Sequence, residues 1–109
     1  MIASGTSPFR TGQVLEIDFP DSTPRITFHS DQELTVEIIA GDNAGFTDTV
    51  QYEAATIRDG LVVLSWQEHI GSTIVHVLDI GAGQTYTLIT PAKGGFMRLL
   101  GRIDRRTAL

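Results

Sequence analysis

Residues 59–79 read DGLVVLSWQEHIGSTIVHVLD and contain the clearest structural pattern in the chain. Two runs rich in β-branched and other apolar residues, Leu61–Glu68 and Ser72–Asp79, have the length and side-chain alternation of β-strands. Before the first run, Asp59-Gly60 is a typical two-residue hairpin turn, because both central positions of such a turn favour a positive φ. Between the two runs, His69-Ile70-Gly71 supplies a second turn. The stretch therefore predicts a pair of antiparallel strands and a third strand before them.

The same pattern continues on both sides of this stretch. Short runs are separated by turn residues at nearly constant spacing, and no helical period of useful length appears. Eight runs are expected to form strands: Val14–Phe19, Thr23–His29, Glu33–Ala40, Asp48–Ile57, Leu61–Glu68, Ser72–Asp79, Gln84–Thr90 and Gly95–Ile103. Because the linkers are short, neighbouring strands should pair antiparallel in sequence order. We predict an all-β fold, a small up-and-down antiparallel β-barrel of about eight strands, with an open sandwich as the alternative.

The chain has 109 residues, enough for one domain. We expect a flexible N-terminal segment at 1–12, the barrel at 13–104 and a tail at 105–109. A hydrophobic content of 41% excludes a disordered chain, and the absence of cysteine excludes disulfides, thiolate metal sites and thiol catalysis. No apolar run is long enough to span a membrane as a helix, and residues 1–12 do not resemble a signal peptide, so we expect a cytoplasmic protein.

The formal net charge of −5 argues against binding to nucleic acid, which requires a basic surface. The charge is uneven, because residues 93–109 hold five basic side chains and one acidic one. We interpret this basic end as a solvated strand and tail; an anion site or a partner site is the alternative.

Alternation assigns the side chains of the central stretch to two faces. One face holds Val62, Leu64, Trp66 and Glu68 from the first strand, and Ile74, His76 and Leu78 from the second. The other face is also apolar, with Leu61, Val63, Val75 and Val77, although the outside of a solvated barrel should be polar. Either a second subunit or a terminal segment would cover this face. Because no segment is left over to form a covering helix, we predict a homodimer.

Metal and nucleophile motifs are missing from the sequence. His29, His69 and His76 lack the i, i+2 or i, i+4 spacing that directs two ligands to one ion, so no metal site is predicted. No serine lies in a glycine-flanked strand-to-helix turn, and the glycine pairs precede strands, where they form turns and not phosphate cradles. We predict no cofactor.

Trp66 and Glu68 are the most informative side chains for function. They are two residues apart in a strand, so they point to the same face. If that face is the lumen, Glu68 lies at one mouth of an apolar pocket, and desolvation would raise its pKa. The alternative is a solvated carboxylate at a strand end beside an ordinary core tryptophan.

Gly60–Asp79 resembles the central hairpin of the MoaF-like and phenolic acid decarboxylase group of calycin barrels. The shared pattern is an apolar strand, Ser-Trp-x-Glu-x-x-Gly, a second apolar strand, and then an aspartate. A looser similarity extends from about Gly12 to Ile103. The resemblance implies a lipocalin-like barrel of eight to ten strands. It also implies a role for Glu68, because the matching glutamate is a catalytic acid in the decarboxylases.

Other decarboxylase features are absent from this sequence. Those enzymes have a Tyr-x-Tyr pair on the first strand, where this chain has Leu15–Phe19 without tyrosine. They also have an arginine after a glycine-rich connection, where this chain has Phe46 and Thr47. Decarboxylation of a phenolic acid is therefore not expected, and the chain is more similar to the MoaF-like side of the group.

Three hypotheses for function follow. The first is a binding module that holds a small, largely apolar or aromatic ligand in its lumen, with Trp66, Glu68, His76, Tyr52 and Tyr86 as candidate ligand-binding residues. The second is a small lyase or isomerase in which Glu68 is the catalytic acid–base. The third is a filled barrel that acts as a dimerising interaction protein. A lumen cavity of at least ~300 Å³ with Glu68 at its wall would favour the first two, and a filled core would argue against both of them.

Overall fold

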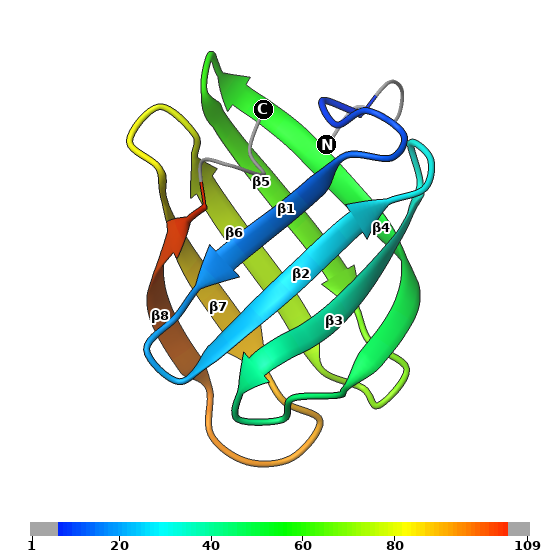
Figure 1. Cartoon of the computed structure of the whole chain (residues 1–109), viewed down its shortest axis with the longest axis vertical. Coiled ribbons are helices and arrows are strands. Elements are labelled where there is room, and N and C mark those ends of the chain that lie inside the picture. The colour runs from blue at the N-terminus through cyan, green and yellow to red at the C-terminus, as the bar shows by residue number, and fades with distance from the viewer. Residues whose placement is uncertain (1–6, 105–109) are drawn as a thin grey trace.

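The computed structural model describes residues 7–104 and has the predicted all-β architecture. Eight strands follow one another along the chain: β1 (Val14–Asp18), β2 (Ser22–Phe28), β3 (Glu33–Gly41), β4 (Thr47–Arg58), β5 (Leu61–Gln67), β6 (Thr73–Asp79), β7 (Gln84–Thr90) and β8 (Met97–Ile103). Each strand pairs antiparallel with the next, and β8 pairs with β1 to close the barrel (Figure 1). The described residues form no helix that could span a membrane.

The hairpin between β4 and β5 lies where the sequence predicts it, but its geometry differs. Gly60 has a φ of 78°, whereas Asp59 is not among the described residues with a positive φ. The pairing of β4 with β5 shifts register between Thr56 and Arg58. A bulge in β4 therefore provides the twist that a turn with two positive φ values would have supplied.

Side chains that alternate along every strand fill the interior. On β5 the buried positions are Val62, Leu64 and Trp66, and on β6 they are Ile74, His76 and Leu78, as the sequence predicts. The first three strands contribute Leu15, Ile17, Ile26, Phe28, Leu34 and Val36, each at most 3% exposed. The alternation therefore produces one continuous core inside the barrel.

Phe9 closes one end of the barrel. It lies in the segment predicted to be flexible, yet it is 3% exposed and stacks on Phe28 with ring centroids 4.1 Å apart. Next to it, the Tyr52 hydroxyl bonds to the Ser7 hydroxyl and to the carbonyl of Ser30, each at 2.8 Å. Residues 7–12 are thus anchored to the barrel; residues 1–6 and the predicted tail at 105–109 lie outside the described part.

The contact between β1 and β8 is the shortest of the strand pairings. Only Ile17 with Ile103 and Asp18 with Arg102 are registered partners, and the Asp104 amide donates to the Glu16 carbonyl at 2.9 Å. By contrast, β5 and β6 pair along seven positions. The seam that closes the barrel is therefore the shortest ladder, with two registered pairs against three between β1 and β2.

Candidate functional site

The mouth of the barrel away from Phe9 contains the predicted Trp66–Glu68 site. Four connections lie at this end: residues 19–21 between β1 and β2, residues 42–46 between β3 and β4, residues 68–72 between β5 and β6, and residues 91–96 between β7 and β8 (Figure 1). Strand register aligns one row of inward-facing side chains that runs from Tyr52 at the closed end through Trp66, Ile74 and Ile89 to Met97 at this mouth.

Exposure along this row shows where the mouth is open. Tyr52 and Trp66 are each 5% exposed and Ile74 is 7% exposed, but Met97 at the end of the row is 41% exposed. Ile89 and Leu99, which also face inward, are half-buried. Apolar side chains inside the mouth are thus accessible to solvent on the β7 and β8 side.

The turn after β5 fixes the position of Glu68. The Glu68 amide donates to the Ser72 carbonyl, and the Gly71 amide donates to the Glu68 carbonyl, each at 2.8 Å. Gly71 has a φ of 98°, and a Cβ there would lie 2.9 Å from Cβ of Ala92 in the neighbouring connection. Glycine is therefore required for this turn to close against residues 91–96.

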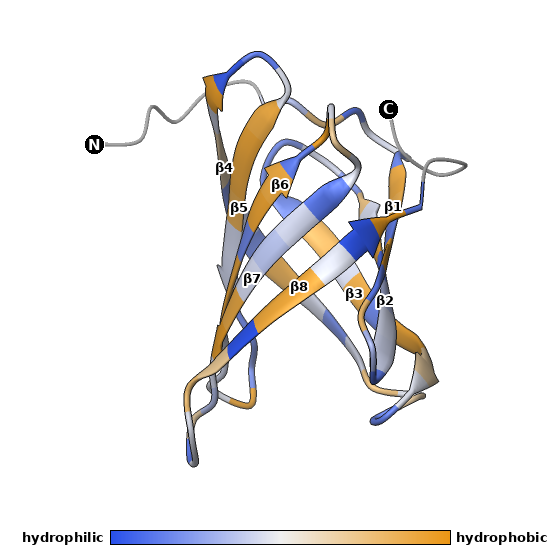
Figure 2. Cartoon of the chain, turned by 90° about the vertical axis from the view of Figure 1, so that its left-hand side faces the viewer, coloured by the Kyte–Doolittle hydropathy of each residue, from blue (hydrophilic) through white to orange (hydrophobic). Residues whose placement is uncertain are grey.

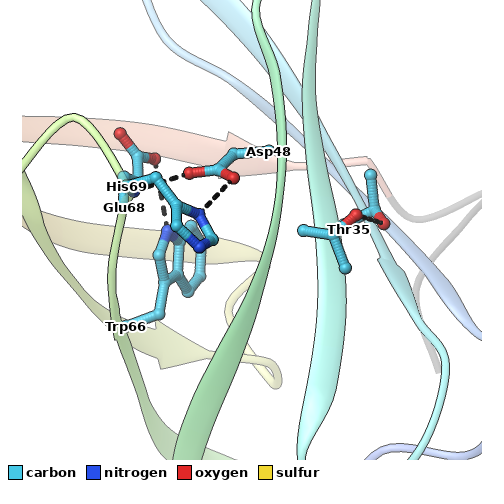
Figure 3. A network of polar contacts seen from close by, with 6 residues as sticks. Thr35, Asp48, Trp66, Glu68 and His69 are labelled. Atoms are coloured by element: carbon cyan, nitrogen blue, oxygen red, sulfur yellow. Dashed lines mark hydrogen bonds and ion pairs between the residues drawn. The ribbon is translucent and has the colours of Figure 1, made fainter.

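Glu68 contacts Trp66 directly. The indole Nε1–H donates to the Glu68 carboxylate at 3.2 Å, so the two side chains that share a face also share a hydrogen bond (Figure 3). Burial raises the pKa of Glu68, the hydrogen bond from Trp66 opposes this rise, and the negative charge of Asp48 adds to it. The direction matches the sequence prediction that desolvation favours the protonated carboxyl.

A second pair, Asp48 and His69, lies beside Glu68 at the mouth. Asp48 accepts hydrogen bonds from the His69 backbone amide at 2.8 Å and pairs with the His69 ring Nδ1 at 2.7 Å (Figure 3). Burial tends to raise the pKa of Asp48, but the His69 hydrogen bonds and charge outweigh it, so that pKa is lowered. This pair could not be predicted from the sequence, because the register of β3 with β4 places Asp48 inward opposite Val36.

His76 lies one row deeper than Trp66. Its side chain is 3% exposed, and its ring lies 5.2 Å from the Trp66 ring and 6.4 Å from the Phe19 ring between centroids. Burial lowers its pKa to about 3. His76 is therefore neutral at physiological pH and bordered by two aromatic rings.

Two buried threonines on β7 determine which nitrogen of His76 holds the proton. The hydroxyls of Thr85 and Thr87 are 3.2 Å apart, and the Thr87 hydroxyl lies 2.7 Å from Nδ1 of His76. If Thr85 donates to Thr87 and Thr87 donates to Nδ1, both buried hydroxyl hydrogens have acceptors; the reverse order leaves the Thr85 hydrogen without one. In the first order the neutral ring carries its proton on Nε2. Among residues 7–104 the buried side-chain polar atom without a hydrogen-bond partner is Nε2 of Gln13, not Nε2 of His76.

The two candidate tyrosines lie in different places. Tyr52 faces inward and pairs in register with Trp66, but its hydroxyl is held by Ser7 and Ser30 near the closed end. Tyr86 faces outward, is 42% exposed and lies opposite Val77 and Leu100. The structure thus brings Trp66, Glu68 and His76 together, leaves Tyr52 at the closed end and places Tyr86 outside the barrel.

Two surface depressions stand out among the described residues. One of about 900 Å³ lies over the seam beside Phe19, Leu100 and Arg102, and one of about 280 Å³ lies over β4 and β5 beside Glu53 and Gln67. Both are open to solvent, and neither is bordered by Glu68. Neither is therefore the lumen cavity that the sequence analysis set as a criterion. Within residues 7–104 no group of three or more histidine, aspartate or glutamate side chains could hold a metal ion.

A closed eight-stranded meander with polar groups at one mouth places the protein among small up-and-down β-barrels. The family model described as MoaF-like matches residues 11–104. The chain belongs to the MoaF-like family, and the resemblance identified in the sequence is confirmed.

One solved structure extends this comparison. A crystal structure of a protein from Burkholderia vietnamiensis, described as a "putative beta-lactamase", is 29% identical and superposes with a TM-score of 0.84. The alignment covers 92% of this chain and 97% of that chain. No curated protein matches the chain.

Proposed function

We propose that this barrel binds a small, neutral, largely apolar ligand that carries a hydrogen-bond acceptor, and that the ligand enters at the mouth between Glu68 and Met97. The observation that carries the proposal is His76, a neutral buried ring with Nδ1 held by Thr87 and with Trp66 and Phe19 beside it. A ligand acceptor that reaches the Nε2–H would gain a hydrogen bond inside the barrel, worth roughly 0.5–1.5 kcal/mol net.

Apolar contact would come from the walls of the mouth. Trp66 and Phe19 present rings on either side of His76, and Met97 and Ile89 present aliphatic surface that faces inward yet meets solvent. The two surface depressions, one beside Phe19 and one beside Tyr52 and Trp66, are open to solvent, so the ligand would occupy the mouth and displace exposed side chains such as Met97. It would not fill a closed internal cavity.

The charges at the mouth favour a neutral ligand. Among residues 7–104 the inward-facing positions include no lysine or arginine, whereas Asp48 and Glu68 are two carboxyl groups at the entrance. A carboxylate ligand would meet like charges and no counter-ion, which is unfavourable where water is excluded. We therefore expect amides, ketones or alcohols to bind in preference to the matching acids.

The test uses Trp66, the one tryptophan of the chain, whose indole N–H gives a single NMR signal. Cinnamamide, benzamide and hexanamide would be titrated beside cinnamate, benzoate and hexanoate. We expect at least one amide to shift the indole signal in a saturable way, and its acid to bind at least tenfold more weakly. The proposal is overturned if no amide shifts the signal, or if the acids bind as well as the amides.

A matched pair of variants tests the role of His76. His76→Phe keeps a ring and removes the donor, whereas His29→Ala removes an exposed imidazole that bonds to Thr35 on the outside of the barrel. We expect His76→Phe to weaken amide binding at least fivefold and His29→Ala to change it less than twofold. Equal effects of the two variants would contradict the assigned donor.

Acid–base catalysis by Glu68 is a second candidate, favoured by the raised pKa of this carboxyl beside the proposed ligand. Hydrolysis of a β-lactam, the activity in the description of the Burkholderia vietnamiensis protein, is not proposed for this chain. Among residues 7–104 no serine hydroxyl is hydrogen-bonded to a histidine, a lysine or a carboxylate, so no activated serine nucleophile is formed.

A further inference from the structure

The outer face of β6, β7 and β8 is apolar where the outside of a barrel should be polar. Strand register places Val77, Tyr86 and Leu100 in one row across these strands, and Val75 and Leu88 lie next to each other in the adjacent row. We call these five residues the β7 face. Figure 2 looks onto this side of the barrel, with β7 and β8 nearest the viewer.

Exposure within the β7 face is high at its centre and edge. Leu100 is 71% exposed and Tyr86 is 42% exposed. The three aliphatic side chains beside them, Val75, Val77 and Leu88, are half-buried. Single exposed hydrophobic residues are ordinary, but a contiguous group on paired strands marks an interaction surface. Val63 on β5 continues the row beyond Val77.

We propose that a second copy of this chain docks on the β7 face, about a twofold axis that runs along β7. The outside of a barrel is convex, so two barrels touch across about three strands, which is the width of this face. Such an axis places Tyr86 against Tyr86 of the second copy, and Val77 against its Leu100. This proposal is independent of ligand binding at the mouth.

Charges at one end of the face support a second copy as the partner. Asp79, Gln84 and Arg102 form the row next to Val77, Tyr86 and Leu100, so Asp79 and Arg102 lie on opposite sides of β7. The axis along β7 brings Asp79 of each copy against Arg102 of the other, and Gln84 against Gln84. Oδ1 of Asp79 accepts from the Ala82 amide at 3.1 Å, which leaves Oδ2 for the arginine.

The other twofold axis within the face is disfavoured by charge. An axis through Tyr86 perpendicular to the strands would place β8 of one copy on β8 of the other. The row that contains Arg102 in one copy would then face the row that contains Arg98 in the other. This arrangement would bring Arg98 of one copy against Arg102 of the other, and like charges in an interface are costly. The axis along β7 instead places Arg98 against Val75, where the side chain can extend its aliphatic part, so the charges select one geometry.

The first test is the mass in solution. Light scattering and sedimentation from about 1 µM to about 500 µM should show a rise from 11.9 kDa towards twice that mass. Leu100→Lys, at a position 71% exposed, should remain folded and monomeric throughout, whereas Thr27→Lys on the outside of β2 should dimerise like the parent. A mass of 11.9 kDa at every concentration, or dimerisation of Leu100→Lys, would overturn the proposal.

The second test is specific for the axis. Because the chain has no cysteine, Tyr86→Cys gives a single thiol that should meet its own copy across sheets about 10 Å apart. A short bis-maleimide should therefore link Tyr86→Cys into dimers and leave Thr27→Cys monomeric. Arg102→Glu should weaken the dimer, and adding Asp79→Lys should restore it, with thermal melts used to verify folding. Equal cross-linking of both cysteine variants, or no rescue by the double variant in its folded form, would rule out this axis.

Discussion

The β1–β3 wall and the β6–β8 wall of the barrel differ on both of their faces. Inside, the β1–β3 wall is lined by six apolar side chains, whereas the β6–β8 wall includes His76, Thr85 and Thr87. Outside, the first wall has polar pairs such as Glu16–Arg25 at 2.7 Å and Asp18–Thr23 at 3.3 Å, while the second has the β7 face. The first wall has the apolar interior and polar exterior that a stable barrel needs. The second wall has polar side chains inside and apolar side chains outside.

The two walls differ in whether packing in water alone explains their side chains. An apolar inner face and a polar outer face are sufficient to fold a barrel in water. Polar groups inside and apolar groups outside each reduce the stability of the isolated chain, so they are best explained by a ligand and a partner. Both departures occur on the same strands, which suggests that this wall has been adapted to binding.

The largest expected effect is on the β1–β3 wall. Phe28→Ala should lower the free energy of unfolding by about 3–5 kcal/mol, because Phe28 is fully buried between Phe9 and Tyr52. Leu100→Ala on the β6–β8 wall should change it by less than about 0.5 kcal/mol in dilute solution. Urea unfolding of both variants would measure the contrast, and similar losses would show that the walls do not differ in this way.

The second effect is on stability in acid. The pKa of His76 is lowered from 6.5 to about 3 in the folded protein, so the unfolded chain takes up this proton first. Stability from the neutral ring is complete above about pH 6.5 and is lost as pH falls towards about 3, with a slope of up to about 1.4 kcal/mol per pH unit. His76→Gln should flatten this slope, measured by urea unfolding at several pH values.

His29→Gln serves as the control for this experiment, because His29 is exposed and its ring bonds to Thr35 on the outside of the barrel. It should leave the slope between pH 3 and 6.5 as in the parent protein. If both variants flatten the slope equally, the acid sensitivity does not come from the β6–β8 wall.

The third effect is on Glu68, whose contribution to stability changes with pH in the opposite direction to that of His76. The pKa of Glu68 is raised above 4.5, mainly by burial, so its contribution to stability is present below that value and is lost as pH rises through the folded pKa. Glu68→Gln keeps an acceptor for the Trp66 indole and removes the charge. The variant should be at least as stable as the parent at pH 7, with Glu53→Gln on the outside of β4 as a neutral control.

The smallest effect is expected for the polar exterior of the β1–β3 wall. Arg25→Ala breaks the pair with Glu16, in which the arginine side chain is 43% exposed, and should cost at most about 1 kcal/mol. The loss should shrink further in high salt, because exposed ion pairs are screened. A loss comparable to that of Phe28→Ala would mean that this exterior is structural and not merely solvated.

Much of the fold could be predicted from sequence, because alternation and turn residues are local signals. All eight strands lie within a few residues of their predicted bounds, and the inward side of β5 and β6 is as predicted. The contact between Trp66 and Glu68 could be predicted for the same reason, since two residues of one strand share a face.

The rest of the site depends on register between distant strands, which no local pattern encodes. Asp48 meets His69 across 21 positions, and Phe19 approaches His76 from the opposite part of the barrel. Phe9 was missed because one aromatic residue in a polar segment carries no periodic signal. Tyr86 was expected at the ligand, but its register with Val77 and Leu100 turns it outward.

The short seam between β1 and β8 has a consequence for folding kinetics. Ile17 and Ile103 are the partners most distant in sequence, so the loop that this contact closes carries the largest entropic cost of any ladder. With two registered pairs, the seam forms few hydrogen bonds and contacts that could offset that cost. The barrel should therefore fold as a growing meander that closes last at β1 and β8, and the native state should reopen there first. Amide hydrogen exchange at Asp104 should then be much faster than at the centres of β5 and β6.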